Sequence, residues 1–161
     1  MHCDTRKLSA LLAQRLNERK QFITTAESCT GGLIATTLTD RAGSSSWFER
    51  AFVAYSNEAK IEMLGVRSET LHTYGAVSEP VVLEMAQGAI LHSRAQIAIS
   101  VSGIAGPSGG NADKPVGTVW FGFATDESLS ARQRIFSGDR VAVREQSLCY
   151  ALSHLLQLLQ K

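Results

Sequence analysis

The sequence is poor in cysteine and histidine, and neither residue type is clustered. Three cysteines, Cys3, Cys29 and Cys149, are an odd number without CxxC spacing. The sequence therefore supports neither a disulfide framework nor a zinc ribbon. The four histidines are isolated and form no HExxH or HxE pattern. Because metal ligands usually share a local element, we expect no metal site and no cofactor.

Long apolar runs and an excess of one charge are also absent. The longest apolar stretches, such as 51–55, fall far short of the roughly 20 residues that a membrane helix requires. The first seven residues lack the continuous apolar segment of a secretory signal. Sixteen lysines and arginines against fifteen acidic residues give a net charge of +1, unlike an electrostatic nucleic-acid binder. We therefore expect a cytoplasmic protein that binds neither membranes nor nucleic acids.

What is present is the composition of a globular domain. The chain has 161 residues, of which 44% are hydrophobic and 19% charged. At this length roughly 70% of the surface of the unfolded chain is buried on folding, which is enough for one core. The sequence contains no internal repeat, low-complexity tract or linker. We therefore expect residues 1–161 to form a single domain.

Apolar periodicity and turn residues predict helices that alternate with strands. The helices are predicted along the apolar stripe from Leu8 to Leu16, over 33–38, from the cap Asn57 through Met63 to Gly65, and after the caps Ser78 and Asp139. The strands are predicted at 22–26, 51–55, 95–101, 116–124 and 129–136, the last two forming a hairpin. This order predicts a three-layer α/β/α sandwich with a mixed sheet.

The turn after the first predicted strand carries the first candidate for chemistry. It reads Glu27-Ser28-Cys29-Thr30-Gly31-Gly32 and leads into a helix. Such a turn lies at the carboxyl edge of the sheet, where open α/β sheets bind ligands. Ser28 can be a nucleophile there, with N–H groups of the glycine pair as an oxyanion hole. Alternatively Ser28 or Thr30 only caps the helix, and the pattern is not a GxSxG nucleophile elbow.

Two further segments follow predicted strand ends. The loop 102–117 holds five of the thirteen glycines but matches neither a GxGxxG fingerprint nor a Walker loop. A loop of this length is usually functional or mobile. The segment 55–60 ends in Lys60, which is either a solvated surface charge or, after loss of water, a base for a serine. Because no histidine lies near these turns, lysine is the better candidate for the base.

Five segments together resemble the C-terminal-domain family of the competence/damage-inducible protein CinA. They are 25–32, 55–60, 75–79, 102–107 and 114–120. The stand-alone members that the chain resembles are nicotinamide-nucleotide amidases, which convert nicotinamide mononucleotide to nicotinate mononucleotide and ammonia in pyridine-nucleotide salvage. Larger members carry an additional N-terminal domain, for which 161 residues leave no room. The resemblance also implies a homo-oligomer.

The resemblance implies a role for each matching residue. Ser28 is the expected nucleophile, Lys60 the general base and Tyr55 a hydrogen-bonding partner close to both, without a metal ion. The turn with the glycine pair is the expected oxyanion region, and Arg140 is expected to assist with the anionic substrate. The residues expected to contact the nucleotide are Glu27, Thr30, Gly31, Gly32, Asn57, Ser102, Gly103, Gly106, Gly109, Gly110 and Arg140.

The sequence alone leaves alternatives to this interpretation open. A domain of the same fold can bind a nucleotide without catalysis, as a regulatory or interaction module. A DNA-associated protein finds little support in a net charge of +1. Cys29 is a rival nucleophile, because a thiolate is intrinsically more reactive than a hydroxyl, although the resemblance favours Ser28.

Overall fold

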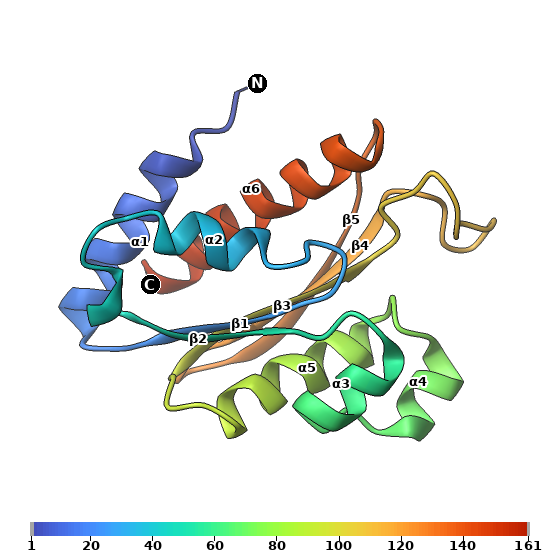
Figure 1. Cartoon of the computed structure of the whole chain (residues 1–161), viewed down its shortest axis with the longest axis horizontal. Helices are drawn as coiled ribbons and strands as arrows, with labels where there is room; N and C mark the ends of the chain where they lie inside the picture. Colours follow the sequence, from blue (N-terminus) through green and yellow to red (C-terminus); the bar gives the residue numbers. More distant parts are fainter. Residues whose placement is uncertain (1, 161) are drawn as a thin grey trace.

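A five-stranded sheet in the order β2-β1-β3-β4-β5 separates two layers of helices (Figure 1). The structure, a computed structural model, describes residues 2–160. The strands are β1 (Ile23–Glu27), β2 (Phe48–Val53), β3 (Ile97–Gly103), β4 (Thr118–Ala124) and β5 (Leu129–Ile135). The helices are α1 (Thr5–Arg19), α2 (Leu33–Thr39), the 3₁₀ turn η1 (Ser44–Ser46), α3 (Asn57–Leu64), α4 (Ser68–Tyr74), α5 (Glu79–Leu91) and α6 (Arg140–Leu159).

The sheet is mixed, and its parallel part creates the edge that carries the candidate site. β1 pairs in parallel with both β2 and β3, whereas β3, β4 and β5 pair antiparallel. α1, α2 and α6 cover one face and α3, α4 and α5 the other (Figure 1). The predicted three-layer α/β/α class with a mixed sheet is therefore confirmed. The carboxyl ends of three parallel strands meet at one edge, the usual ligand edge of such sheets.

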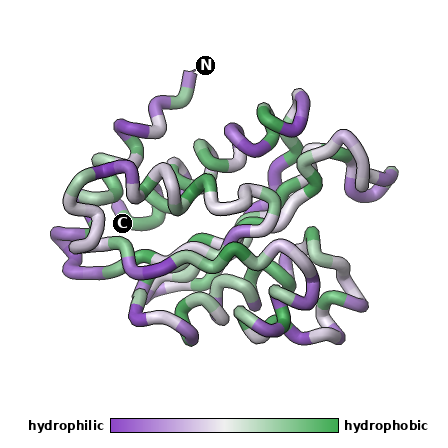
Figure 2. Tube along the Cα trace, in the orientation of Figure 1, coloured by the Kyte–Doolittle hydropathy of each residue, from purple (hydrophilic) through white to green (hydrophobic). Residues whose placement is uncertain are grey.

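Each face of the sheet has its own hydrophobic core. Under α1, α2 and α6 the core contains large side chains such as Trp47, Phe121 and Phe123. On the α5 side most of the core residues are smaller, such as Ala26 and Val82, and Met85 is the longest side chain among them. Figure 2 shows hydrophobic residues along the strands and hydrophilic ones toward the tips of loops. β1 is buried at all five positions, as expected for a central strand covered on both faces.

Most predicted elements are present, with differences where apolar signals are weak. β2 begins before the predicted 51–55 segment and ends at Val53, because this edge strand has mostly exposed or half-buried side chains. The helix predicted from Asn57 is capped instead by Ser56, whose hydroxyl accepts from Ala59 N at 3.0 Å. α4 was not predicted, because its short sequence SETLHTY has little apolar periodicity. Among the helices within residues 2–160, none has both the length and the apolar character needed to cross a bilayer.

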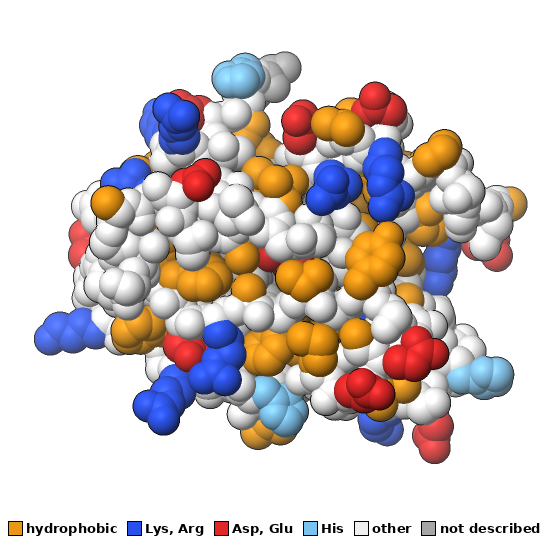
Figure 3. Space-filling view, in the orientation of Figure 1, with side chains coloured by type: hydrophobic (Ala, Val, Ile, Leu, Met, Phe, Trp, Pro, Cys, Tyr) orange, Lys and Arg blue, Asp and Glu red, His pale blue; other side chains and the backbone are white. Residues whose placement is uncertain are grey.

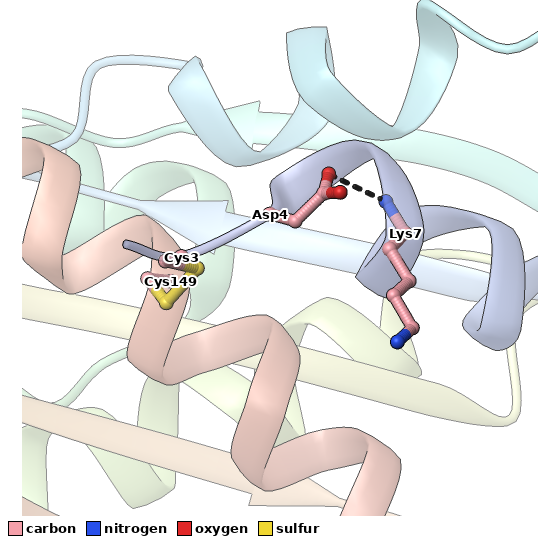
Figure 4. The surroundings of a disulfide bond; sticks show 4 residues. All are labelled: Cys3, Asp4, Lys7 and Cys149. Carbon is pink, nitrogen blue, oxygen red and sulfur yellow. Dashed lines mark hydrogen bonds between the residues drawn. A yellow bond between two sulfur atoms is a disulfide. The ribbon is translucent and has the colours of Figure 1, made fainter. Parts of the chain in front are cut away.

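A disulfide joins Cys3 to Cys149, contrary to the expectation from the sequence (Figure 4). The two cysteines are 146 positions apart, so their spacing carries no sign of the pairing. α1 and α6 pack on the same face of the sheet, and this tertiary contact brings the two cysteines together. Next to the bond, Asp4 caps α1 by accepting from Lys7 N at 3.0 Å. The remaining cysteine, Cys29, is a buried thiol.

Candidate active site

The turn that carries Ser28 is fixed by backbone hydrogen bonds. Ser28 N–H donates to Val101 O in β3 at 3.0 Å, which extends the sheet by one residue beyond β1. Gly31 N–H then donates back to Ser28 O at 3.0 Å. Gly31 and Gly32 have φ values of +58° and +99°, a region in which other residues are strained. The two glycines therefore allow the chain to pass directly from the strand into α2.

Glu27 caps α2 from inside the protein. Its carboxylate accepts from Ile34 N at 2.9 Å and Ala35 N at 3.0 Å, and from the hydroxyl of Thr30 at 2.7 Å. Neither Glu27 nor Thr30 has exposed surface. A carboxylate at a helix N-terminus satisfies free N–H groups and interacts favourably with the helix dipole. The structure therefore places both residues beneath the turn, where they support it, and gives the capping role to Glu27 instead of Ser28 or Thr30.

Lys60 extends from the first turn of α3 into the protein. Its Nζ donates to Ser28 Oγ at 3.0 Å and to Tyr55 O at 2.9 Å, and the residue is only 2% exposed. No carboxylate of the described chain forms an ion pair with it. Burial lowers the pKa of Lys60, because the charged ammonium loses its hydration. The surface-charge interpretation of Lys60 is therefore wrong.

Tyr55 contributes through two different groups. Its main-chain oxygen accepts from Lys60 Nζ and also from Ser28 Oγ, at 3.3 Å. The residue is 60% exposed, and its phenol oxygen accepts from the guanidinium of Arg140 at 3.2 Å. The expected closeness of Tyr55 to Ser28 and Lys60 thus involves the carbonyl, a group for which side-chain patterns give no signal.

Arg140 links two walls of the site. It is the first residue of α6, whose N-terminus is capped by Asp139 through a bond from Ala142 N of 2.9 Å. Its guanidinium donates to Gly106 O at 2.8 Å and to the phenol of Tyr55. Because a guanidinium carries five N–H donors, others are left for a ligand.

In Figure 3, which shows the face that carries β2, hydrophobic side chains form a band between the two helical layers.

These groups line a cleft of about 340 Å³, which falls in the range of small-molecule sites. The predicted site residues that line it are Ser28, Tyr55, Asn57, Lys60, Ser102, Gly103, Gly106, Gly109 and Arg140. The predicted residues that do not line it are Glu27, Thr30, Gly31, Gly32 and Gly110. Gly110 packs against its own loop instead, since a Cβ there would lie 2.5 Å from Val116 N.

The cleft also has lining residues that were not singled out from the sequence. Ala76 and Val77 form one wall, and Ser108 lies in the glycine-rich loop. Ala76 and Val77 belong to the segment 75–79, one of the five segments of the family resemblance, so the family motifs could have identified them as site residues. Within residues 2–160 there is no group of three or more His, Cys, Asp or Glu residues that could hold a metal ion.

Cys29 borders the cleft next to Ser28, but its environment opposes ionisation. Its thiol is buried, and desolvation raises the pKa of Cys29 to about 11. At neutral pH a thiol of this kind is protonated, and the thiolate is the nucleophilic form. The geometry therefore favours Ser28, which has the lysine as its neighbour, over Cys29.

Fold and site together define an α/β protein with a serine–lysine pair at the carboxyl edge of its mixed sheet. The family model described as the CinA C-terminal domain matches residues 5–159. The chain therefore belongs to the CinA C-terminal-domain family, which confirms the resemblance drawn from its motifs.

Relatives and solved structures agree with this assignment. The chain is 60% identical over 152 residues to the nicotinamide-nucleotide amidohydrolase PncC of Escherichia coli K12, covering 94% of this chain and 92% of that protein. It is 47% identical to a CinA-like protein of Syntrophobacter fumaroxidans, covering 94% of this chain but 36% of that longer protein. The crystal structure of the competence damage-inducible protein A of Klebsiella pneumoniae superposes with a TM-score of 0.94 at 41% identity, covering 98% of each chain.

Proposed function

We propose that this chain is a nicotinamide-nucleotide amidase. It would hydrolyse the carboxamide of nicotinamide mononucleotide to nicotinate mononucleotide and ammonia, as a step of pyridine-nucleotide salvage. The observation that carries the proposal is the contact of 3.0 Å between buried Lys60 and Ser28 in an open cleft. The name and the nearly full-length 60% identity of the Escherichia coli relative support the choice of substrate.

In the first half of the proposed reaction, Ser28 is acylated. The neutral amine of Lys60 takes the hydroxyl proton while Ser28 Oγ attacks the carboxamide carbon. The C–N bond of the tetrahedral intermediate then breaks, and Lys60 returns the proton to the departing nitrogen, which leaves as ammonia. The lowered pKa of Lys60 supports this role, because it increases the fraction of neutral amine near neutral pH.

In the second half, water hydrolyses the nicotinoyl ester. The same lysine takes a proton from water as the water oxygen attacks the ester carbon, and the proton then returns to Ser28 Oγ. The products are nicotinate mononucleotide and the free serine. Tyr55 O accepts from Lys60 Nζ at 2.9 Å and so holds the amine beside the serine in both halves.

The negative oxygen of the intermediate needs N–H donors. Gly31 N–H donates to Ser28 O, so the structure does not support it as one of these donors. In hydrolases with a nucleophile elbow, the backbone N–H of the residue directly after the nucleophile is an oxyanion donor. In this chain that residue is Cys29, which lines the cleft. We therefore assign the oxyanion contact to the backbone N–H of Cys29.

The 5′-phosphate is assigned to Arg140 and the glycine-rich loop. The guanidinium already donates to Gly106 O, so it lies beside the backbone of this loop. Ser108 and Gly109, from the same loop, also line the cleft. Guanidinium groups and exposed backbone N–H groups both bind phosphate oxygens well. A homo-oligomer, a single domain over residues 1–161 and a cytoplasmic location remain predictions.

Incubation with nicotinamide mononucleotide tests the proposed function. We expect ammonia and nicotinate mononucleotide to form in equal amounts, measured by a coupled ammonia assay and by chromatography. Calorimetric binding of the nucleotide without release of ammonia would instead support the non-catalytic module. Neither binding nor turnover would refute both functions.

A further inference from the structure

Arg144 contacts the nucleophile turn from a distant part of the chain. It lies one helical turn after Arg140 in α6 and is half-buried. Its Nε donates to Cys29 O at 3.1 Å, and its Nη2 donates to Thr30 O at 3.0 Å. One planar guanidinium therefore holds two successive carbonyl groups directly after Ser28. Arg144 does not line the cleft, in contrast to Arg140.

These two bonds set the orientation of the peptide groups in the turn. In a trans peptide the C=O and the N–H point in opposite directions. With the carbonyls of Cys29 and Thr30 directed at Arg144, the N–H groups of Thr30 and Gly31 point away from it. Gly31 N–H meets Ser28 O at 3.0 Å, as this orientation requires. The guanidinium thus fixes the side of the turn that faces α6.

The inner side of the turn is held independently. Glu27 accepts from the hydroxyl of Thr30 and from the first N–H groups of α2. Ser28 N–H is bonded to β3. Cys29 is the position between these attachments, and its carbonyl has Arg144 as its partner at 3.1 Å. Loss of Arg144 would leave the carbonyls of Cys29 and Thr30 without their charged donor. The peptide groups after these two residues could then rotate, and the second of them carries the Gly31 N–H that holds Ser28 O.

We propose that Arg144 is a positioning residue for amide hydrolysis. It holds the turn so that Ser28 Oγ and the backbone N–H of Cys29 keep their places relative to the substrate carbonyl. This inference rests on the proposed amidase function. Because Arg144 acts through the turn and not on the nucleotide, its loss should reduce kcat and leave KM unchanged.

Arg144→Met tests the role, with Arg144→Lys as the conservative variant. A misplacement of about 1 Å costs about 100-fold in rate, so we expect kcat of Arg144→Met to fall about 100-fold. KM should stay within about twofold. Arg144→Lys should recover only part of kcat. The ammonium keeps the positive charge, but it lacks the planar fork that binds both carbonyls. The pH at half-maximal kcat should not move, since burial sets the pKa of Lys60.

Arg19→Met is the matched control. Arg19 also makes two side-chain hydrogen bonds, to Gln21 at 2.7 Å and Asp126 at 2.9 Å, but at the opposite end of the sheet. This variant should lose stability in thermal denaturation and keep the wild-type kcat. Equal kcat values for Arg144→Met and Arg19→Met would overturn the proposal. A rise in KM alone would also overturn it, since Arg144 would then act on the substrate.

A second measurement separates this proposal from the proposed function. A fluorophosphonate reacts with an activated serine oxygen with loss of fluoride, whatever the natural substrate. We expect labelling of Ser28 to be at least about tenfold slower in Arg144→Met than in Arg19→Met, because turn misplacement lowers the reactivity of the serine. If the wild type releases no ammonia, the amidase function fails, but slower labelling still supports the positioning role. Equal labelling rates would overturn that role even in an active amidase.

Discussion

Two segments at the carboxyl edge of the sheet are held in different ways. Residues 28–30 of the turn after β1 are buried. The N–H, carbonyl and hydroxyl of Ser28 all have partners within the protein. The glycine-rich loop is exposed over residues 107–113. Arg140 attaches it to the site, and Lys114 Nζ attaches it to Tyr74 O at 2.7 Å. We therefore expect a rigid turn, which carries the proposed chemistry, beside an adaptable loop, which binds the substrate in the proposed function.

Among the residues that contact these two segments, the largest effect is expected at Lys60, the partner of the rigid turn. Lys60→Met removes the proposed base and should reduce kcat by about 10²- to 10⁴-fold. The same variant should unfold at a higher temperature than the wild type, because it replaces a buried amine with an apolar side chain of similar length. Lys7→Met, which changes an exposed lysine, is the control for both readouts. A fall in melting temperature or a wild-type kcat would contradict this account of Lys60.

The lowered pKa of Lys60 also predicts how stability and activity depend on pH. Burial lowers the pKa of Lys60 in the folded protein, whereas an unfolded lysine titrates at about 10.4. Between these two pKa values the unfolded chain binds the extra proton, so the free energy of unfolding should rise with pH across that interval. Over the lower part of it, kcat should rise and then level off as the amine becomes neutral. In Lys60→Met this rise in the free energy of unfolding should be absent. Denaturant titrations at a series of pH values measure the difference.

A smaller effect is expected where the loop meets the phosphate. Loss of a hydrogen bond to a charged group costs about 1.5–3 kcal/mol, so Arg140→Met should raise KM for nicotinamide mononucleotide about 10- to 150-fold. The wild type should use nicotinamide riboside, which lacks the phosphate, far less efficiently than the nucleotide. In Arg140→Met this preference should largely disappear. Equal kcat/KM of the wild type for the two compounds would show that the phosphate lies elsewhere.

The smallest effect is expected at the outer attachment of the loop. Lys114→Met removes the bond to Tyr74 O, where a positive charge also interacts favourably with the C-terminus of α4. We expect KM to rise about two- to tenfold with kcat unchanged, in line with the net value of a single hydrogen bond. Steady-state kinetics beside the Lys7→Met control measures this difference. A drop in kcat alone would place Lys114 with the rigid turn instead of the loop.

Local signals account for what the sequence predicted well. The two glycines after Ser28, the cap Asp139 and the alternation of helices with strands are properties of short segments, and the fold class followed from them. The serine–lysine pair was a prediction of a different kind, because a sequence separation of 32 between Ser28 and Lys60 carries no information on the distance between them. The residues alone made lysine the better candidate for the base, the family motifs assigned Ser28 and Lys60 as the pair, and the structure adds the distance and the burial.

Contacts between distant segments account for what was missed. Cys3 and Cys149 meet only because α1 packs on α6. Glu27 was expected to contact substrate, but its carboxylate turns inward to the N-terminus of α2. Arg144 resembles any other arginine of an amphipathic helix until α6 is placed against the Ser28 turn. None of these roles has a signature in the spacing of residues, since each depends on the packing of α6 or α2.

Ammonia release by Ser28→Ala and Cys29→Ala, measured beside the wild type, tests the central claim most directly. Ser28→Ala should lose at least about 10⁴-fold in kcat, the scale seen when a catalytic nucleophile is removed. Cys29→Ala should keep a kcat close to that of the wild type and lose about 1–2 kcal/mol of stability, because it removes a buried thiol. The account would be contradicted if folded Ser28→Ala retained most of the activity while Cys29→Ala lost it.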